Sequence, residues 1–268
     1  MKVVQYGIID SHGHMGPIWN YYIPYNSGQA MLDNMDHLGF EATVISSILA
    51  LCGDPELGNR YTLEACRKFP GRFLGHFSVN PHYPELNERD IPLFFAESCI
   101  VGFKAHPELS GDYPLDGKGY EFMFRYASEH KIPILSHTYY GGDRLDVFEA
   151  LAKEYPDAPL IIGHGALDLG TQKAIDLCNR YPSLYYDLCS PVNKRFGPLN
   201  LVIRELDPDK VLFGTDAPSN DPAYSLGSVM FCDATEEVKR KWFRDNFLRL
   251  YHRAPKALSL KIFDSEKR

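Results

Sequence analysis

The chain has 268 residues, of which 44% are hydrophobic and 24% are charged. This composition is typical of a globular protein and argues against a disordered chain, a collagen-like repeat or a membrane-spanning protein. The formal net charge is −7, and no block of basic residues is visible. Binding to nucleic acid or to an anionic membrane surface is therefore not expected.

The cysteine pattern and the first residues predict the cellular compartment of the protein. No Cys-x-x-Cys pair is present, which favours free thiols over a disulfide framework. The first residues lack the continuous apolar run of a signal peptide, and no stretch approaches the roughly 20 apolar residues of a membrane span. We expect a cytoplasmic protein with no membrane partner. The six cysteines are Cys52, Cys66, Cys99, Cys178, Cys189 and Cys232.

Eight short apolar or β-branched runs recur along the chain at intervals of about 30 residues, the length of one strand–helix unit. Helical patterns fill several of the gaps, at residues 27–39, 121–128, 146–155 and 236–250. A doubly wound sheet would carry a glycine-rich turn after its first strand, and none is present. The sequence therefore predicts a (β/α)8 TIM barrel that forms a single domain over residues 1–268. The eight runs are residues 3–9, 42–47, 73–79, 101–105, 134–137, 160–163, 184–187 and 211–214.

Polar residues follow five of these runs, at the barrel end where TIM-barrel active sites lie. Half of the ten histidines of the chain are among them. His12 and His14 are separated by one residue, so both side chains can face the same side of an extended segment. The residues at these ends are Asp10, His12, His14, Lys104, His106, His137, His164 and Asp216.

Imidazole and carboxylate groups together suit Zn²⁺ and other first-row metals. His12, His14, His137 and Asp216 supply such a ligand set, which predicts a catalytic metal site. Each residue taken alone also has an ordinary structural explanation. His164 fits a buried, hydrogen-bonded histidine, Asp216 fits a helix cap, and Lys104 fits a side chain that reaches solvent.

The chain resembles the branch of the amidohydrolase superfamily that includes aminocarboxymuconate-semialdehyde decarboxylase. The resemblance spans nearly the whole chain, and its motifs occur in the expected order. They are IIDSHGHM, VGFKAHP, PILSHT, LIIGHGA, LYYDLCS, VLFGTDAP and the closing WFRDNFLRLYH.

The resemblance implies that His12, His14, His137 and Asp216 bind one divalent ion. It makes His164 the acid/base histidine, or a ligand if a second metal binds. Some superfamily members bridge two metals with a carbamylated lysine, which Lys104 would supply, but this branch favours one metal. Zn²⁺ is the ion expected first, with Mn²⁺ or another divalent ion as alternatives. The resemblance also implies a dimer or a tetramer.

Hydrolysis of a small ester, lactone or amide, which can be cyclic or carboxylated, is the first functional hypothesis. The metal would activate water, Asp216 would take its proton, and His164 would stabilise the developing charge. Asp10 would orient one of the metal ligands by contacting it, without binding the metal itself. The alternative is decarboxylation of a small unsaturated or aromatic carboxylic acid at the same metal. Hydration and a metal-binding barrel without catalysis are further alternatives.

Residues on the loops are candidates for contacts with a small-molecule substrate. Aromatic side chains there suit a planar ligand, and basic ones suit a carboxylate. Lys104 and His106 are candidates for the substrate or for a second metal. The loop candidates are Trp19, Tyr139 and Arg144, with Lys194 and Arg195 nearby.

Overall fold

The structure is a computed structural model that describes residues 6–16, 22–138, 145–189 and 197–259. Eight parallel strands form one sheet in which each strand pairs with the next along the chain. The fold is a (β/α)8 barrel, as the sequence predicts. The strands are β1 (Ile8–Met15), β2 (Phe40–Ser47), β3 (Phe73–Ser78), β4 (Ile100–Ala105), β5 (Ile134–Ser136), β6 (Leu160–Ile162), β7 (Leu184–Asp187) and β8 (Val211–Leu212).

The barrel closes through β1 and the segment that follows β8. The backbone N–H of Ser11 donates to the carbonyl of Phe213 at 2.9 Å, and Gly13 forms a parallel bridge with Ala217. On its other side β1 pairs with β2 as far as Met15, which lies opposite Ser47. His12 and His14 therefore lie inside the first strand, whereas the sequence places them after its end.

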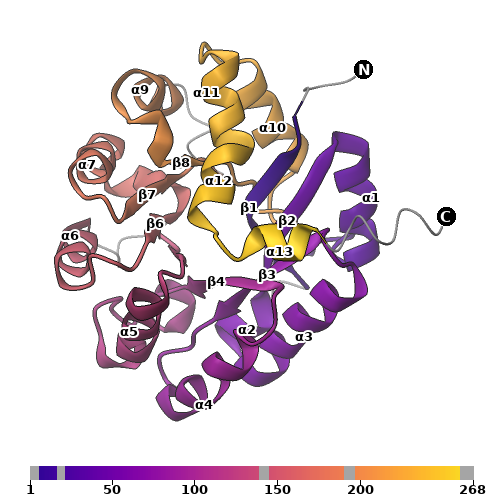
Figure 1. The fold of residues 1–268 in the computed structure, drawn as a ribbon, viewed down its shortest axis with the longest axis vertical. Coiled ribbons are helices and arrows are strands. Elements are labelled where there is room, and N and C mark those ends of the chain that lie inside the picture. Colours follow the sequence, from indigo (N-terminus) through magenta and orange to yellow (C-terminus); the bar gives the residue numbers. More distant parts are fainter. Residues whose placement is uncertain (1–5, 17–21, 139–144, 190–196, 260–268) are drawn as a thin grey trace.

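Helices surround the ring of strands on its outside (Figure 1). The predicted helix at residues 27–39 is confirmed as α1. Ser27 accepts a hydrogen bond from the N–H of Ala30, and Gly39 ends the helix with φ of 80°, a left-handed value that suits glycine. The helices before residue 200 are α1 (Gly28–Leu38), α2 (Ile48–Cys52), α3 (Pro55–Lys68), α4 (Pro84–Phe94), α5 (Glu121–His130), α6 (Leu145–Glu154), α7 (Leu167–Arg180) and α9 (Pro198–Glu205).

The last two helices, α12 (Asn246–Leu250) and α13 (Ala254–Leu258), lie across the ring of strands (Figure 1). The helices α10 (Pro222–Met230) and α11 (Glu236–Arg240) lie at its edge. A π-helical turn at Lys241–Asp245 joins α11 to α12, so the predicted helix at residues 236–250 has a wider turn at its centre. Phe247 and Tyr251 are buried against apolar side chains from the early part of the strands, such as Ile9 and Leu74. This packing fills the end of the barrel that lies opposite the carboxyl ends of the strands.

None of the helices in the described part of the chain combines the length and apolar character that a membrane crossing requires.

Candidate metal centre and active site

The side chain of Asp10 joins β1 to the segment after β8. Its Oδ1 accepts hydrogen bonds from the backbone N–H groups of His12 at 3.1 Å and Thr215 at 3.0 Å. Its Oδ2 accepts one from the Thr215 hydroxyl at 2.6 Å. Burial raises the pKa of Asp10 to about 7, against the lowering effect of these three hydrogen bonds. Asp10 thus fixes the backbone at His12 and at Thr215, the residue before Asp216.

Replacing Thr215 with valine keeps the shape of the side chain and removes the hydroxyl donor to the buried Asp10 carboxyl. The hydroxyl also accepts a hydrogen bond from the N–H of Ala217 at 3.1 Å, and this contact is lost as well. We expect the free energy of unfolding to fall by about 1–3 kcal/mol, because buried polar groups lose a partner. Urea unfolding at neutral pH measures this change. An unchanged midpoint and slope would show that these two contacts contribute nothing to stability.

Three of the predicted ligands lie together at the mouth of the barrel. The Nε2 atoms of His14 and His12 are 3.1 Å and 3.8 Å from Oδ1 of Asp216. The three ligand atoms lie within 4.8 Å of one another. Asp216 has φ of 62°, an uncommon value for a residue other than glycine, and this backbone conformation accompanies the placement of the carboxylate beside the two rings.

The protonation states of these three residues suit a metal ligand. Burial lowers the pKa of His12 well below its ordinary value, and it lowers the pKa of His14 as well. Burial alone would raise the pKa of Asp216, but the hydrogen bond from His14 and the neighbouring histidines and Lys104 outweigh it and give about 2. Neutral imidazoles and an ionised carboxylate are the forms that bind metal ions.

His14 is held from its other side by a serine. Its Nδ1 is 2.9 Å from the hydroxyl of Ser46 on β2, which pairs with His14 in the sheet. A hydroxyl can donate or accept a hydrogen bond. Ser46 therefore accommodates the tautomer of His14 that leaves the Nε2 lone pair available to an ion.

His137 lies beside this group, and its ring contacts three other side chains. Its Nδ1 is 3.0 Å from Nε2 of His164, and its Nε2 is 3.3 Å from Oε2 of Glu108. The ring stacks on His106 with centroids 3.8 Å apart. His106 also accepts a hydrogen bond at Nδ1 from the N–H of Leu109, which orders the turn after β4. Among the described residues, two groups of ligand atoms are close enough to share an ion, and neither contains His137. One is His12, His14 and Asp216, and the other is His12, His164, Asp187 and Cys189.

His164 reaches the site from a left-handed turn at the end of β6. His164, Gly165 and Ala166 have φ of 56°, 58° and 51°. A Cβ at Gly165 would overlap the ring of Tyr186, so this position requires glycine. The His164 ring lies 4.9 Å from the His12 ring and 4.6 Å from the His137 ring, between centroids.

Lys104 is fully buried, so the alternative in which its side chain reaches solvent is wrong. Its Nζ lies 2.8 Å from Nε2 of His12. Burial lowers the pKa of Lys104 to about 8, while the nearby carboxylates of Asp216 and Asp187 act in the other direction. The site therefore contains a buried amine directly beside a predicted ligand.

Three contacts of the site involve residues that the sequence analysis did not assign a role. Asp187 Oδ2 lies 2.7 Å from Nδ1 of His12, and Cys189 Sγ lies 2.9 Å from Nδ1 of His164. Asn220 donates to Oδ2 of Asp216 at 2.7 Å. Asp187 ends the seventh run, so the strand-end rule that selected the other residues would also have found it. Trp19, Tyr139, Arg144, Lys194 and Arg195 lie outside the described residues.

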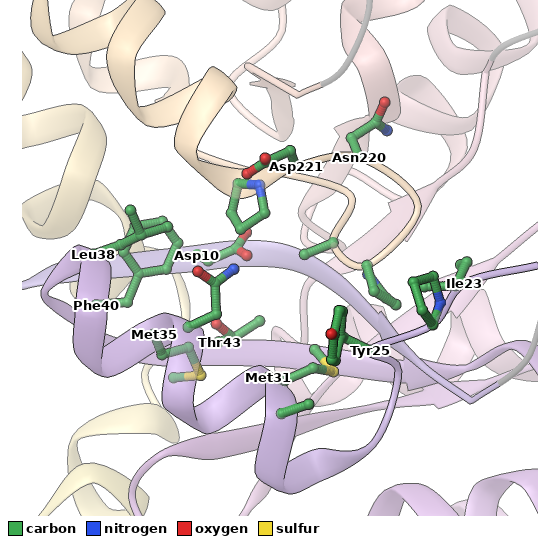
Figure 2. Close-up of a pocket in the computed structure, with 16 residues that line it drawn as sticks. Asp10, Ile23, Tyr25, Met31, Met35, Leu38, Phe40, Thr43, Asn220 and Asp221 are labelled. Carbon is green, nitrogen blue, oxygen red and sulfur yellow. The ribbon is translucent and has the colours of Figure 1, made fainter.

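A pocket of about 460 Å³ lies between α1 and the loop that follows β8 (Figure 2). Met31 and Met35 line it from α1, and Asp10 and Asn220 line it on the side of the site. His12, His14 and Asp216 are not among the described residues that line this pocket. The pocket therefore does not contain the three proposed ligands.

Comparisons with known proteins identify the family and the fold. A sequence profile of the amidohydrolase family matches residues 9–253. No curated protein matches the chain in sequence. Solved structures match with high coverage at identities that establish a common fold only.

One similar structure is 2,6-dihydroxybenzoate decarboxylase from Rhizobium, with a TM-score of 0.71, 16% identity and coverage of 92% of this chain and 98% of that chain. A second is dihydroxybenzoic acid decarboxylase from Polaromonas sp. JS666 with bound manganese and the inhibitor 2-nitroresorcinol, with a TM-score of 0.73, 17% identity and coverage of 92% and 97%. A third is 4-oxalomesaconate hydratase from Rhodopseudomonas palustris, with a TM-score of 0.67, 20% identity and coverage of 95% and 98%.

Proposed function

The chain belongs to the amidohydrolase family and is an enzyme of that family, and we propose that it releases CO₂ from a small aromatic or unsaturated carboxylic acid without oxidation. Two of the similar structures are decarboxylases of dihydroxybenzoic acids, and another is a 5-carboxyvanillate decarboxylase. These names favour decarboxylation over the hydrolysis that the sequence analysis placed first.

The observation that carries the proposal is the composition of the buried site. Two neutral imidazoles and one carboxylate converge beside the amine of Lys104 and the ring of His164. The convergent donors suit a divalent cation, and a buried ammonium suits the carboxylate of a substrate.

The donor atoms present fit a divalent ion. Nε2 of His12, Nε2 of His14 and Oδ1 of Asp216 are of the types that Zn²⁺ and Mn²⁺ accept, and we propose them as ligands, with His137 as a fourth. A bound ion would act as a Lewis acid and polarise an oxygen substituent of the substrate.

The side chains of the chain would then carry out the remaining steps. The ammonium of Lys104 would hold the substrate carboxylate, since a charge-assisted hydrogen bond is strong in a buried site. The bond between the ring carbon and the carboxyl carbon breaks, its electron pair stays on the ring carbon, and CO₂ leaves. His164 would deliver the proton that replaces CO₂. Burial lowers the pKa of His164 well below its ordinary value, and the negative charge of a bound carboxylate would oppose this shift.

The test is to incubate the metal-loaded enzyme with 2,6-dihydroxybenzoate and related acids in D₂O. Release of CO₂, with one deuterium at the carbon that carried the carboxyl group, is expected. Esters, lactones and amides form the parallel panel. Release of acid and alcohol from that panel, with no CO₂ from the acids, would assign hydrolysis to the site. Addition of water to an unsaturated acid without CO₂ release would assign hydration.

Replacing Lys104 with methionine keeps an unbranched apolar stem and removes the charge. We expect KM for the carboxylate substrate to rise about 10- to 100-fold, because a hydrogen bond to a charged group contributes about 1.5–3 kcal/mol. Steady-state kinetics at matched metal occupancy measures this effect. Lys118→Met, at an exposed position on another part of the chain, is the control. An unchanged KM would remove Lys104 from substrate binding.

A further inference from the structure

The end of β7 contacts two histidines of the site at once. Oδ2 of Asp187 is 2.7 Å from Nδ1 of His12, and it accepts the backbone N–H of His164 at 3.0 Å. Sγ of Cys189 is 3.2 Å from Nδ1 of His12 and 2.9 Å from Nδ1 of His164. All four residues are buried, with 3% exposure at most. The side-chain contacts are therefore made at Nδ1 of the two histidine rings.

The contacts of His12 define which of its nitrogens carries the hydrogen. A carboxylate accepts hydrogen bonds and cannot donate them, so Nδ1 of His12 must donate to Asp187. A neutral ring then has its lone pair at Nε2. Nε2 is the atom that lies 3.8 Å from Asp216 and 2.8 Å from the amine of Lys104, which donates when charged. Asp187 thus directs the lone pair of His12 toward the ligand group.

The contacts of Cys189 favour the opposite arrangement in His164. Nδ1 of His12 is already a donor, so it cannot accept a hydrogen bond from the thiol. Asp187 is a second acceptor within reach of the thiol. A thiol that donates to Nδ1 of His164, over the 2.9 Å contact, makes this nitrogen an acceptor. The hydrogen of His164 is then on Nε2, which points to Nδ1 of His137 at 3.0 Å.

We propose that Asp187 and Cys189 are positioning residues that, in the metal-free protein, hold His12 in the Nδ1–H form and His164 in the Nε2–H form. The proposal rests on the proposed function, in which His12 binds the ion and His164 moves the proton. Residues at the end of β7 thereby place the hydrogen on different nitrogens of two neighbouring histidines, one of which is a proposed ligand and the other the proposed proton donor. Buried partners of this kind commonly fix the tautomer of a ligating histidine and contribute 10- to 100-fold to metal affinity.

The first measurement is on the unaltered protein, labelled with ¹⁵N at histidine, without metal and with Zn²⁺. Two-bond ¹⁵N–¹H correlations report the tautomer of each ring. The Nδ1–H form of His12 and the Nε2–H form of His164 are expected in the metal-free protein, with the same form of His12 retained on Zn²⁺ binding. The reverse tautomer at His12 would overturn the role of Asp187, and the reverse tautomer at His164 would overturn that of Cys189.

The second measurement compares variants. Asp187→Asn is expected to weaken Mn²⁺ binding about 10- to 100-fold, because an amide can donate and so favours the wrong tautomer of His12. Cys189→Ala should leave Mn²⁺ affinity within about threefold and mix the two tautomers of His164. Cys189→Ser, whose hydroxyl still donates, should restore the Nε2–H form. Cys178→Ala, at a buried cysteine of α7, is the matched control.

Free Mn²⁺ is counted by its electron paramagnetic resonance signal, so none of these readouts requires turnover. A protein that fails to decarboxylate any acid would contradict the proposed function and leave the tautomers measurable. Mn²⁺ affinity of Asp187→Asn equal to that of the unaltered protein would overturn the proposal. A sulfur-to-metal absorption band on Co²⁺ binding that disappears in Cys189→Ser would also overturn it, because Cys189 would then be a ligand. If Asp187→Asn does not fold, the spectra of the unaltered protein and the Cys189 variants still decide.

Discussion

Replacing Asp216 with asparagine is expected to lower kcat by at least about 1,000-fold and to reduce the bound divalent ion. The carboxylate lies beside the Nε2 atoms of both His12 and His14. An amide oxygen carries no charge and is a weaker ligand for a divalent cation than a carboxylate oxygen. The variant loses one of the proposed ligands, so both the bound ion and the reaction that depends on it are expected to be lost.

The measurement is kcat together with the metal content of the purified variant. Asp233→Asn changes the same chemical group at an exposed position and serves as the control. Loss of both activity and metal in Asp216→Asn, with neither lost in the control, is the expected pattern. Near-normal turnover of Asp216→Asn would remove this carboxylate from the catalytic machinery.

Replacing His164 with glutamine is expected to lower kcat by about 10²–10⁴-fold while the protein keeps its divalent ion. The His164 ring lies close to His12 and His137, but it is not part of the group formed by His12, His14 and Asp216. The variant therefore separates proton transfer from metal binding, which Asp216→Asn does not.

Metal content, kcat and deuterium incorporation are measured on the same preparation of this variant. His130→Gln, at an exposed position at the end of α5, is the control. If His164→Gln loses its metal as fully as Asp216→Asn does, His164 would be a ligand and its role in proton transfer would need revision.

The barrel could be predicted from the sequence because each strand–helix unit leaves a periodic signal. The apolar strand runs recur at a nearly constant interval, and α1 carries both a capping serine at Ser27 and a terminal glycine at Gly39. The joining of β1 to the segment after β8 could not be predicted in this way. It depends on Asp10 and Thr215, which are 205 residues apart and form no local pattern.

Only the site residues at the ends of strands could be predicted from the sequence. His12, His14 and Asp216 come together because the ends of parallel strands meet at one rim of a barrel. Glu108 could not be found by the same rule, because it lies in a short 3-10 turn (Glu108–Ser110) three residues beyond the end of β4. Cys189 gave no signal either, since a single cysteine in the sequence does not indicate a contact with a histidine 25 residues away.

The reaction was the least predictable property. Hydrolysis, hydration and decarboxylation can use the same imidazole and carboxylate ligands, so the ligand types do not separate them. Hydrolysis is the first hypothesis from the sequence, whereas two of the similar structures are dihydroxybenzoic acid decarboxylases and a third is a hydratase. The difference depends on the bound substrate and on which atom receives the proton, and neither is encoded in the ligand motif.

The central claim is that residues from the two ends of the chain bind one divalent ion at the mouth of the barrel. The direct test is anomalous diffraction from crystals of the protein loaded with Zn²⁺ or Mn²⁺, combined with elemental analysis. The account predicts one ion per chain, with Nε2 of His12, Nε2 of His14 and a carboxylate oxygen of Asp216 each about 2.0–2.2 Å from it. An ion bound elsewhere, or full activity in protein freed of metal by a chelator, would contradict the account.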